Sequence, residues 1–327
     1  MSQEPPAAAR PPVDPTELGR RLRDGDRSAA PAALNLIEDR SPAGRERART
    51  LLHEVSPAEL GGEAPPHLVG ITGPPGSGKS SLLSAMLAEW RRRGRSVAVL
   101  AVDPSSRRSG GALLGDRARI EHDPRDEGVL IRSTAAGTRL GGLAPPTREA
   151  AQVLAPAYDV VVVETVGVGQ SETDVAELCD TAAVVVQPGS GDVLQFLKAG
   201  IMEIPDVLVV TKEDLGDVAR RARRDLASAL RSLGAGDTPV VGVSSIPPPH
   251  GIGDLLDALD AHRKGVDVEA ARTAARRLAA VAEFATERGE SGLRALGGRR
   301  EALRLLEQQD PGLEIAALVG VLERAAG

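Results

Sequence analysis

The sequence predicts an α/β fold in which a mostly parallel sheet is flanked by helices, with further helical extensions at both ends of the chain. Three observations support this. Seven short aliphatic runs alternate with helical segments, which is typical of βα units that build a parallel sheet. Hydrophobic residues make up 41% of the 327 residues but aromatic residues only 1%, so the core must be aliphatic. Finally, a glycine-rich loop joins the first run to a helix.

The predicted strands are continuous runs of Val, Ile, Leu and Ala, and such runs are typical of strands that are buried on both faces of a sheet. They cover residues 68–72, 97–102, 129–132, 159–164, 182–187, 206–211 and 239–244. Helical periodicity between them predicts helices at 79–93, 146–156, 215–233 and 252–263. We therefore expect a core domain over residues 63–265.

The two ends of the chain differ from this pattern. Residues 1–15 are rich in Pro and Ala and are expected to be a disordered tail. Residues 16–62 predict an N-terminal extension of two or three helices, with apolar residues recurring at Leu18, Leu22, Leu34, Ile37, Leu51 and Leu52. Residues 266–327 predict a C-terminal helical segment that is rich in Ala, Arg and Leu.

Composition excludes several classes of function. A net charge of −6 argues against nucleic acid or an anionic membrane as the main partner. Cys179 is the only cysteine, so the chain has neither a disulfide framework nor a multi-thiolate metal site. No apolar run approaches the roughly 20 residues that span a bilayer, and the first residues have no signal-peptide pattern. We expect a soluble, cytoplasmic protein.

A phosphate-binding loop follows the first predicted strand. The stretch GPPGSGKS fits G-x-x-x-x-G-K-[ST] and opens a helix, as the motif requires. Glycines let successive backbone N–H groups converge on phosphate oxygens, aided by the positive end of the helix. Lys79 is expected to reach the β- and γ-phosphates and Ser80 to bind Mg²⁺. The predicted contacts are Gly73, Pro74, Pro75, Gly76, Ser77, Gly78, Lys79, Ser80 and Ser81.

The base is predicted by TKED, which directly follows the sixth strand and matches [NT]-K-x-D. Asp214 can accept hydrogen bonds from guanine N1–H and from the exocyclic amine, whereas adenine would leave its carboxylate unpaired. The aliphatic stem of Lys212 is expected to cover the base. Ser244, Ser245 and Ile246 follow the seventh strand, like a backbone turn that contacts guanine O6. Alternatively, Asp214 is merely the cap of a polar helix N-terminus.

Two further acids stand at the ends of predicted strands, where ligands of open parallel sheets gather. A run of valines ends on Glu164, and strands that end in this way often present a carboxylate to bound magnesium. Asp103 ends the second strand and is expected to face the metal and the attacking water. The alternative for Asp103 and the proline that follows it is the start of a turn.

Four stretches together resemble one family. VETVGVGQSE, AVDPSS, SGGALLGDRARI and GSGDVLQFLKAGI are similar to the methylmalonyl-CoA mutase-associated GTPases of the MeaB/ArgK type, within the SIMIBI class of P-loop GTPases. The resemblance covers residues from about 16 to 265 and includes NLIEDRSP in the N-terminal extension. It implies a Mg²⁺-dependent GTPase that converts GTP to GDP. It also implies a homodimer formed through the C-terminal helices.

The resemblance also implies roles for individual residues. Glu164 would hold Mg²⁺ through a water molecule, Asp103 would bind the metal or position the attacking water, and Gly167 would bring its backbone N–H to the γ-phosphate. Residues of two switches and a further partner-coupling loop are suggested at Asp116, Arg117, Gln170, Asp192, Gln195 and Lys198.

The function implied by the resemblance is a chaperone for an adenosylcobalamin-dependent acyl-CoA mutase, gating cofactor loading and protecting or reactivating the mutase. Two features depart from the family. Thr211 stands where Asn is usual, which affects nucleotide affinity more than base choice. Phe284 is the only aromatic residue of the C-terminal segment, although the family typically has several there.

Three other functions are alternatives. A nickel metallochaperone GTPase usually needs a His-rich tract or paired cysteines, which five scattered histidines and one cysteine do not provide. A protein-targeting GTPase of the signal-recognition class would have a DTAGR-like segment where this chain has ETVGVG. A kinase of a transport-system protein shows no acceptor-binding feature that would separate it from the mutase chaperone.

Overall fold

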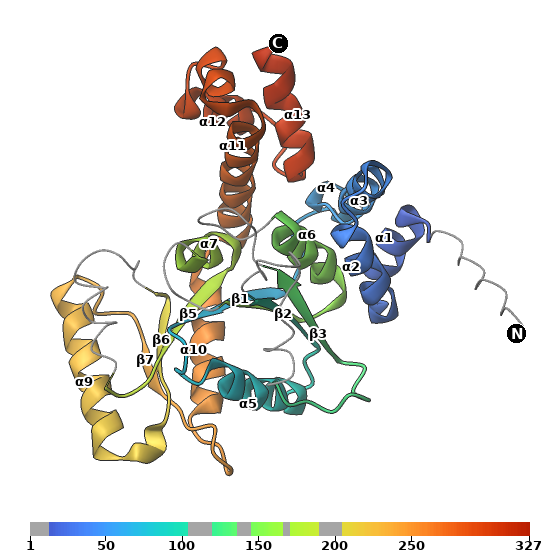
Figure 1. Cartoon of the computed structure of the whole chain (residues 1–327). Coiled ribbons are helices and arrows are strands. Elements are labelled where there is room, and N and C mark those ends of the chain that lie inside the picture. The colour runs from blue at the N-terminus through green and yellow to red at the C-terminus, as the bar shows by residue number, and fades with distance from the viewer. Residues whose placement is uncertain (1–12, 104–119, 136–144, 166–170, 190–204) are drawn as a thin grey trace, which may run out of the picture.

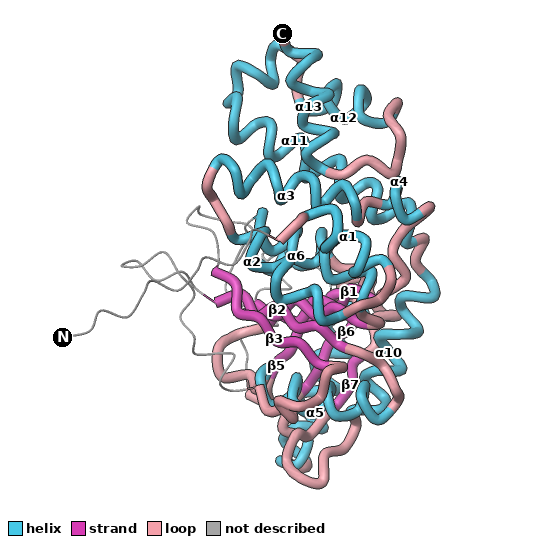
Figure 2. The backbone as a smooth tube through the Cα atoms, turned by 90° about the vertical axis from the view of Figure 1, so that its right-hand side faces the viewer, coloured by secondary structure: helices cyan, strands magenta, loops and turns pink. Residues whose placement is uncertain are grey.

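The computed structural model describes residues 13–103, 120–135, 145–165, 171–189 and 205–327 (Figures 1 and 2). A seven-stranded sheet has the order β3-β2-β4-β1-β5-β6-β7, and every neighbouring pair is parallel. The α/β prediction is therefore confirmed. The strands are β1 (His67–Thr72), β2 (Val97–Asp103), β3 (Val129–Ala135), β4 (Val160–Thr165), β5 (Thr181–Val186), β6 (Val207–Val210) and β7 (Val240–Gly242).

Helices cover both faces of this sheet, as the continuous aliphatic strands predict (Figure 2). One face packs against α5 (Lys79–Arg92) and α10 (Ile252–Gly265). The other packs against α6 (Pro145–Leu154), α7 (Ser171–Leu178) and α9 (Asp217–Ser232). Figure 1 shows α5 and α10 below the sheet, and α6 and α7 above it. Trp90 and Tyr158 are buried at 2% and 6% exposure, as expected of packing residues.

The N-terminal extension consists of α1 (Pro15–Arg23), α2 (Ala30–Glu38), α3 (Pro42–Glu54) and the four-residue α4 (Pro57–Leu60). The sequence predicted two or three helices, so α4 is the difference. A serine or aspartate caps three of the four starts, at Asp14, Ser41 and Ser56. The six predicted apolar positions of the extension are all buried, in one core with β2, β4 and α6. α1 begins at Pro15, the last residue of the predicted tail.

The C-terminal segment forms α11 (Val268–Ala295), α12 (Arg299–Glu307) and α13 (Ile315–Ala326). These helices stand away from the sheet in Figure 1 and enclose an apolar core of their own around Phe284. Gly289 breaks the helical conformation inside α11 with φ 67° and ψ −174°, a conformation that side chains other than glycine rarely adopt.

A largely buried arginine of α11 joins this segment to the sheet. Arg272 Nε and Nη2 donate to the two carboxylate oxygens of Asp180 at 2.8 and 2.7 Å, and Arg272 also donates to the carbonyl oxygens of Ala64 and Pro66. Asp180 also accepts the backbone N–H of Leu68, at the start of β1, at 2.9 Å. Burial by itself raises the pKa of Asp180, but Arg272 and the Leu68 N–H lower it overall.

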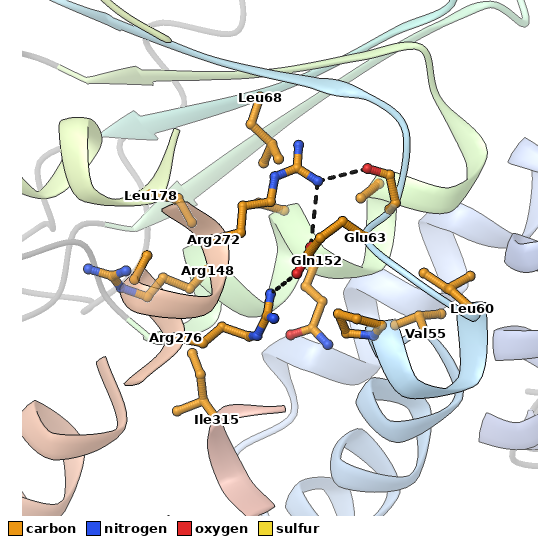
Figure 3. Close-up of a pocket in the computed structure, with 15 residues that line it drawn as sticks. Val55, Leu60, Glu63, Leu68, Arg148, Gln152, Leu178, Arg272, Arg276 and Ile315 are labelled. Atoms are coloured by element: carbon orange, nitrogen blue, oxygen red, sulfur yellow. Dashed lines mark hydrogen bonds and ion pairs between the residues drawn. The ribbon is translucent and has the colours of Figure 1, made fainter. Parts of the chain in front are cut away.

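A cavity of about 100 Å³ lies beside Arg272, between α4, α6, α7, α11 and α13 (Figure 3). Its walls are mainly aliphatic, with Leu60, Leu68 and Ile315 among them. Glu63 lies at its polar end, 2.6 Å from Arg276 Nη1 and 3.8 Å from Arg272 Nη1. These charges link the segment between α4 and β1 to α11. Among the described residues, no helix combines the length and apolarity needed to cross a membrane.

One partly buried acid of α6, Glu149, predicts a pH effect on stability. Burial raises the pKa of Glu149 to about 7; the positive charge of Arg40 lowers this pKa, and the negative charge of Glu283 raises it. Because the folded-state pKa lies above the unfolded value, folding favours the protonated form, so stability falls as pH rises from about 4.5 to about 7.

Glu149→Gln removes this ionisation and should increase the free energy of unfolding at pH 8 by about 1–3 kcal/mol. At pH 4 the substitution should have little effect. Urea unfolding at the two pH values measures the difference. Glu46→Gln, which alters a side chain that is 75% exposed, is the control. An equal effect of Glu149→Gln at both pH values would contradict the explanation.

Candidate nucleotide-binding site

The predicted site residues come from separate motifs. Those that lie in the described ranges meet at the carboxyl edge of the sheet. The phosphate loop leaves β1, Asp103 is the last residue of β2 and Glu164 is the penultimate residue of β4. TKED follows β6, and Ser244 lies two residues beyond β7. Since all seven strands are parallel, these segments lie along one edge, where ligands of such sheets bind.

Three glycines shape the phosphate loop. Gly73, Gly76 and Gly78 have φ values of 144°, 76° and 91°, a region that favours glycine. At Gly73 a Cβ atom would also lie only 2.1 Å from the carbonyl oxygen of Val185 in β5. The loop therefore presses against the neighbouring strand, and a side chain at this position would displace it.

Lys79 is the first residue of α5 and is only 6% exposed. Its Nζ donates to the carbonyl oxygens of Gly73 and Pro74, at 2.7 and 3.2 Å, so the ammonium group lies against the loop that precedes it. Ser80 follows within the first turn of the helix. The loop and the positive end of α5 thus carry the donors that bind phosphate in other proteins.

The acids at the centre of the edge suit a hard cation. Glu164 lies in β4, beside Ile71 of β1 and Ala101 of β2, and is 2% exposed. The next residue, Thr165, donates its hydroxyl to Thr72 at 3.1 Å, which fixes the end of β4 against the end of β1. A carboxylate from Glu164 and a hydroxyl from Ser80 are oxygen ligands of the kind that Mg²⁺ prefers. These residue types therefore fit the predicted metal.

Thr211 connects the predicted base site to the phosphate loop. Its hydroxyl oxygen lies 2.7 Å from the carbonyl oxygen of Ser77 and 3.0 Å from that of Val186, and the side chain is 3% exposed. The hydroxyl at position 211 can therefore contact the loop backbone.

Thr211→Val keeps the shape of this side chain but leaves the Ser77 carbonyl without its donor. We expect GTP affinity to fall by about 5- to 30-fold, equivalent to roughly 1–2 kcal/mol for a lost buried hydrogen bond. Fluorescence titration with a GTP analogue measures the change. Thr50→Val, in α3, removes a hydroxyl far from the site and is the control. Wild-type affinity in Thr211→Val would show that the contact does not support nucleotide binding.

Lys212 and Asp214 lie in a tight turn after Thr211. Lys212 has a left-handed backbone with φ 56°, which is uncommon for a residue other than glycine and often marks a functional position. Its Nζ donates to Gln187 Oε1. Asp214 is exposed, and its Oδ1 accepts a 2.7 Å hydrogen bond from the hydroxyl of Ser244. The structure therefore brings the two predicted base-binding segments into direct contact.

The Ser244 hydroxyl also accepts a hydrogen bond from the backbone N–H of Ile246 at 3.3 Å. Ser245 lies between them in the same turn. Several other predicted residues lie outside the described ranges: Asp116, Arg117, Gly167, Gln170, Asp192, Gln195 and Lys198. Their roles stay predictions, as do the roles of the described site residues toward nucleotide and metal.

Sequence reasoning missed two residues that support the base-binding turn. Gln187 holds the Lys212 ammonium group. The backbone N–H of Glu213 donates to the Val243 carbonyl oxygen at 3.0 Å, and the Glu213 carboxylate lies over Gly242. Glu213 occupies the variable position of the T-K-x-D motif, so the motif itself gave no reason to select it.

The parallel sheet, the glycine loop that opens α5 and the turn after β6 define a P-loop GTPase. A family described as the methylmalonyl-CoA mutase-associated GTPase MeaB matches residues 30–294. This chain belongs to that family.

Several relatives are similar over much of the chain. A Pyrococcus horikoshii protein named "Putative GTPase" is 48% identical over 204 residues, which cover 62% of this chain and 61% of that protein. A Caulobacter vibrioides protein of the same name is 41% identical and covers 81% of this chain and 82% of its own. The Caenorhabditis briggsae "Methylmalonic aciduria type A homolog, mitochondrial" is 41% identical, over 67% of this chain and 56% of its own length.

Among solved structures, one titled as the LAO/AO transport system kinase superposes with a TM-score of 0.65 and 28% identity, covering 97% of this chain and 99% of that one. The match spans only about three fifths of the Pyrococcus horikoshii and Caenorhabditis briggsae proteins.

Proposed function

We propose that the chain binds Mg²⁺ and GTP at the carboxyl edge of the sheet, hydrolyses GTP, and uses this cycle to gate adenosylcobalamin loading into an acyl-CoA mutase and to protect or reactivate it. Membership of the mutase-associated GTPase family is the observation that carries the proposal. The Caenorhabditis relatives, named for methylmalonic aciduria type A, support the same connection. A methylmalonyl-CoA mutase is the partner that we expect, in the cytoplasm.

In this proposal the phosphate loop and Lys79 bind the triphosphate. The backbone N–H groups between Gly73 and Ser80 surround the phosphates, and Lys79 Nζ exchanges its two carbonyl acceptors for β- and γ-phosphate oxygens. A cation fixed beside the γ-phosphate stabilises negative charge that develops as the bond to GDP breaks. Nothing in this step requires a covalent intermediate on the protein.

Ser80 and Glu164 would hold Mg²⁺, which neutralises charge on the phosphates when bound. Glu164 is suited to a contact through water, because its carboxylate starts from a buried position in β4. Asp103, at the end of β2, would orient the attacking water or bind the metal. The backbone N–H of Gly167 would approach the γ-phosphate and sense its release.

If GTP orders segments that are released after hydrolysis, the protein has two conformational states that bind the mutase differently. Intrinsic hydrolysis should then be slow and should be accelerated by the partner. We also propose that the protein is a homodimer through residues 266–327. In the described part of this segment, Leu278 is a large apolar side chain with 48% exposure, which makes it a candidate for that contact.

The test is GTP hydrolysis with and without a purified adenosylcobalamin-dependent methylmalonyl-CoA mutase. We expect a complex whose affinity depends on the bound nucleotide, and a higher rate of phosphate release. Other acyl-CoA mutases show whether the partner is a different member of that class. If no such mutase binds or changes the rate, the chaperone proposal is wrong.

The similarity to the structure titled as a transport system kinase favours a second candidate, transfer of phosphate to a protein. GTP labelled at the γ-phosphate separates the two functions. Label recovered as free phosphate supports hydrolysis, whereas label retained on an acceptor protein supports the kinase.

A further inference from the structure

Glu213 is a partly buried acid next to Asp214, in the turn that carries the proposed base contacts. Its side chain is only 14% exposed, and its Oε1 lies 3.2 Å from Arg223 Nη1 of α9. Its Oε2 is buried and makes no hydrogen bond. A buried carboxylate oxygen without a donor is unfavourable, so its position needs a compensating reason.

Gly242, the last residue of β7, leaves room for this carboxylate. A Cβ atom at Gly242 would lie 2.0 Å from Glu213 Oε2 and 2.9 Å from Arg223 Nη1. The carboxylate therefore lies directly on the backbone at the end of β7, in space that any other residue at position 242 would fill.

Three consecutive contacts join this turn to the end of β7. The Glu213 carboxylate covers Gly242, its backbone N–H donates to the Val243 carbonyl oxygen at 3.0 Å, and Asp214 accepts the Ser244 hydroxyl at 2.7 Å. Glu213 makes the first two of these contacts and Asp214 the third, while their partners Gly242, Val243 and Ser244 are consecutive in the chain. The placement of Glu213 on Gly242 therefore fixes how far Asp214 stands from Ser244 and from the base.

We infer that Glu213 is a positioning residue for guanine recognition: its carboxylate, held between Gly242 and Arg223, sets the orientation of Asp214 toward the base. This inference rests on the proposed role of Asp214. Glu213 touches neither nucleotide nor metal in this account, so it should affect base selectivity and not the chemical step.

Inosine triphosphate provides the selective readout, because inosine lacks the exocyclic amine of guanine. A well-oriented Asp214 should favour GTP over ITP by roughly 10- to 100-fold, since ITP loses a hydrogen bond to a charged group. Glu213→Ala should reduce this ratio to about threefold or less and should raise KM for GTP, with kcat within about twofold of wild type.

Two further variants separate positioning from a general loss of stability. Gly242→Ala keeps the Glu213 charge but displaces the carboxylate, so it should lower the GTP-to-ITP ratio as well. Glu213→Gln keeps the shape and should retain most of the ratio. Glu38→Ala, which removes a glutamate paired with Arg132 at the opposite side of the sheet, is the control.

The inference is overturned if Glu213→Ala lowers thermal stability but leaves the GTP-to-ITP ratio at its wild-type value. Asp214→Asn, measured with GTP and XTP in the same assay, distinguishes an error in the proposed base site from an error in the role of Glu213. If Asp214→Asn does not change the base preference, the proposed base site itself is wrong. If it does, and Glu213→Ala leaves the ratio unchanged, only the role of Glu213 is wrong.

Discussion

Asp214→Asn is expected to transfer the nucleotide preference from guanosine to xanthosine, with a loss of GTP affinity of roughly 10²- to 10⁴-fold. Asp214 offers only acceptors, which match N1–H and the exocyclic amine of guanine. Its Oδ1 also receives the Ser244 hydroxyl at 2.7 Å, so the carboxylate is already held in place. Asn replaces one acceptor by a donor, which matches the carbonyl that xanthine carries in place of the amine.

Calorimetric titration of the wild-type protein and the variant with GTP and XTP measures this change in nucleotide preference. Asp225→Asn changes an exposed aspartate of α9 and should leave both affinities unchanged. If Asp214→Asn still binds GTP as wild type does, guanine is not recognised by this carboxylate, and the alternative of a simple helix cap for Asp214 gains support.

Lys79→Ala has the second largest expected effect, a decrease of about 10²- to 10³-fold or more in kcat/KM for GTP, as for removal of one strong donor to a transition-state oxygen. Lys79 is held at the start of α5, with its Nζ on the carbonyl oxygens of Gly73 and Pro74. No other side chain of the phosphate loop carries a positive charge. The loss should therefore appear in the chemical step as well as in binding.

Phosphate release at saturating GTP, together with the KM, measures both parts. Lys264→Ala, at the end of α10, removes the same charge away from the site and should have wild-type kinetics. Retention of hydrolysis within tenfold of wild type in Lys79→Ala would mean that the loop does not bind the triphosphate in the proposed way.

The sheet could be predicted from the sequence because its strands carry a strong local signal. The valines of β4 and β5 are buried on both faces of the sheet, so successive positions carry aliphatic side chains. Such continuous runs predict a strand even though apolar and polar residues do not alternate. The glycines of the phosphate loop were equally readable, because their positive φ values restrict the residue type.

The remaining features depend on contacts between residues far apart in the chain. The Thr211 hydroxyl meets the carbonyl oxygen of Ser77, 134 residues away. Arg272 contacts Asp180 across 92 residues. The phosphate loop and TKED each selected their own residues, but no local pattern predicts that Thr211 meets Ser77. Arg272 and Asp180 carry no local pattern that would select either of them.

The end of β7 shows the same limitation on a smaller scale. The aliphatic run predicted a strand over 239–244, but β7 ends at Gly242. Beyond it, Val243 receives the Glu213 N–H and Ser244 pairs with His250 in an isolated antiparallel bridge. The Val243 N–H still donates to the Val210 carbonyl oxygen of β6 at 2.8 Å, whereas its own carbonyl oxygen is bound by the base-binding turn. The sequence showed the hydrophobic run but not the competing partner.

Binding of GTP and ATP to the wild-type protein in the presence of Mg²⁺ tests the central claim most directly. With a lysine-bearing phosphate loop and Asp214 at the base, calorimetry should show GTP bound at least roughly 10³-fold more tightly than ATP, because adenine leaves the Asp214 carboxylate without donors. Equal affinity for the two nucleotides, or no binding of GTP, would contradict the account.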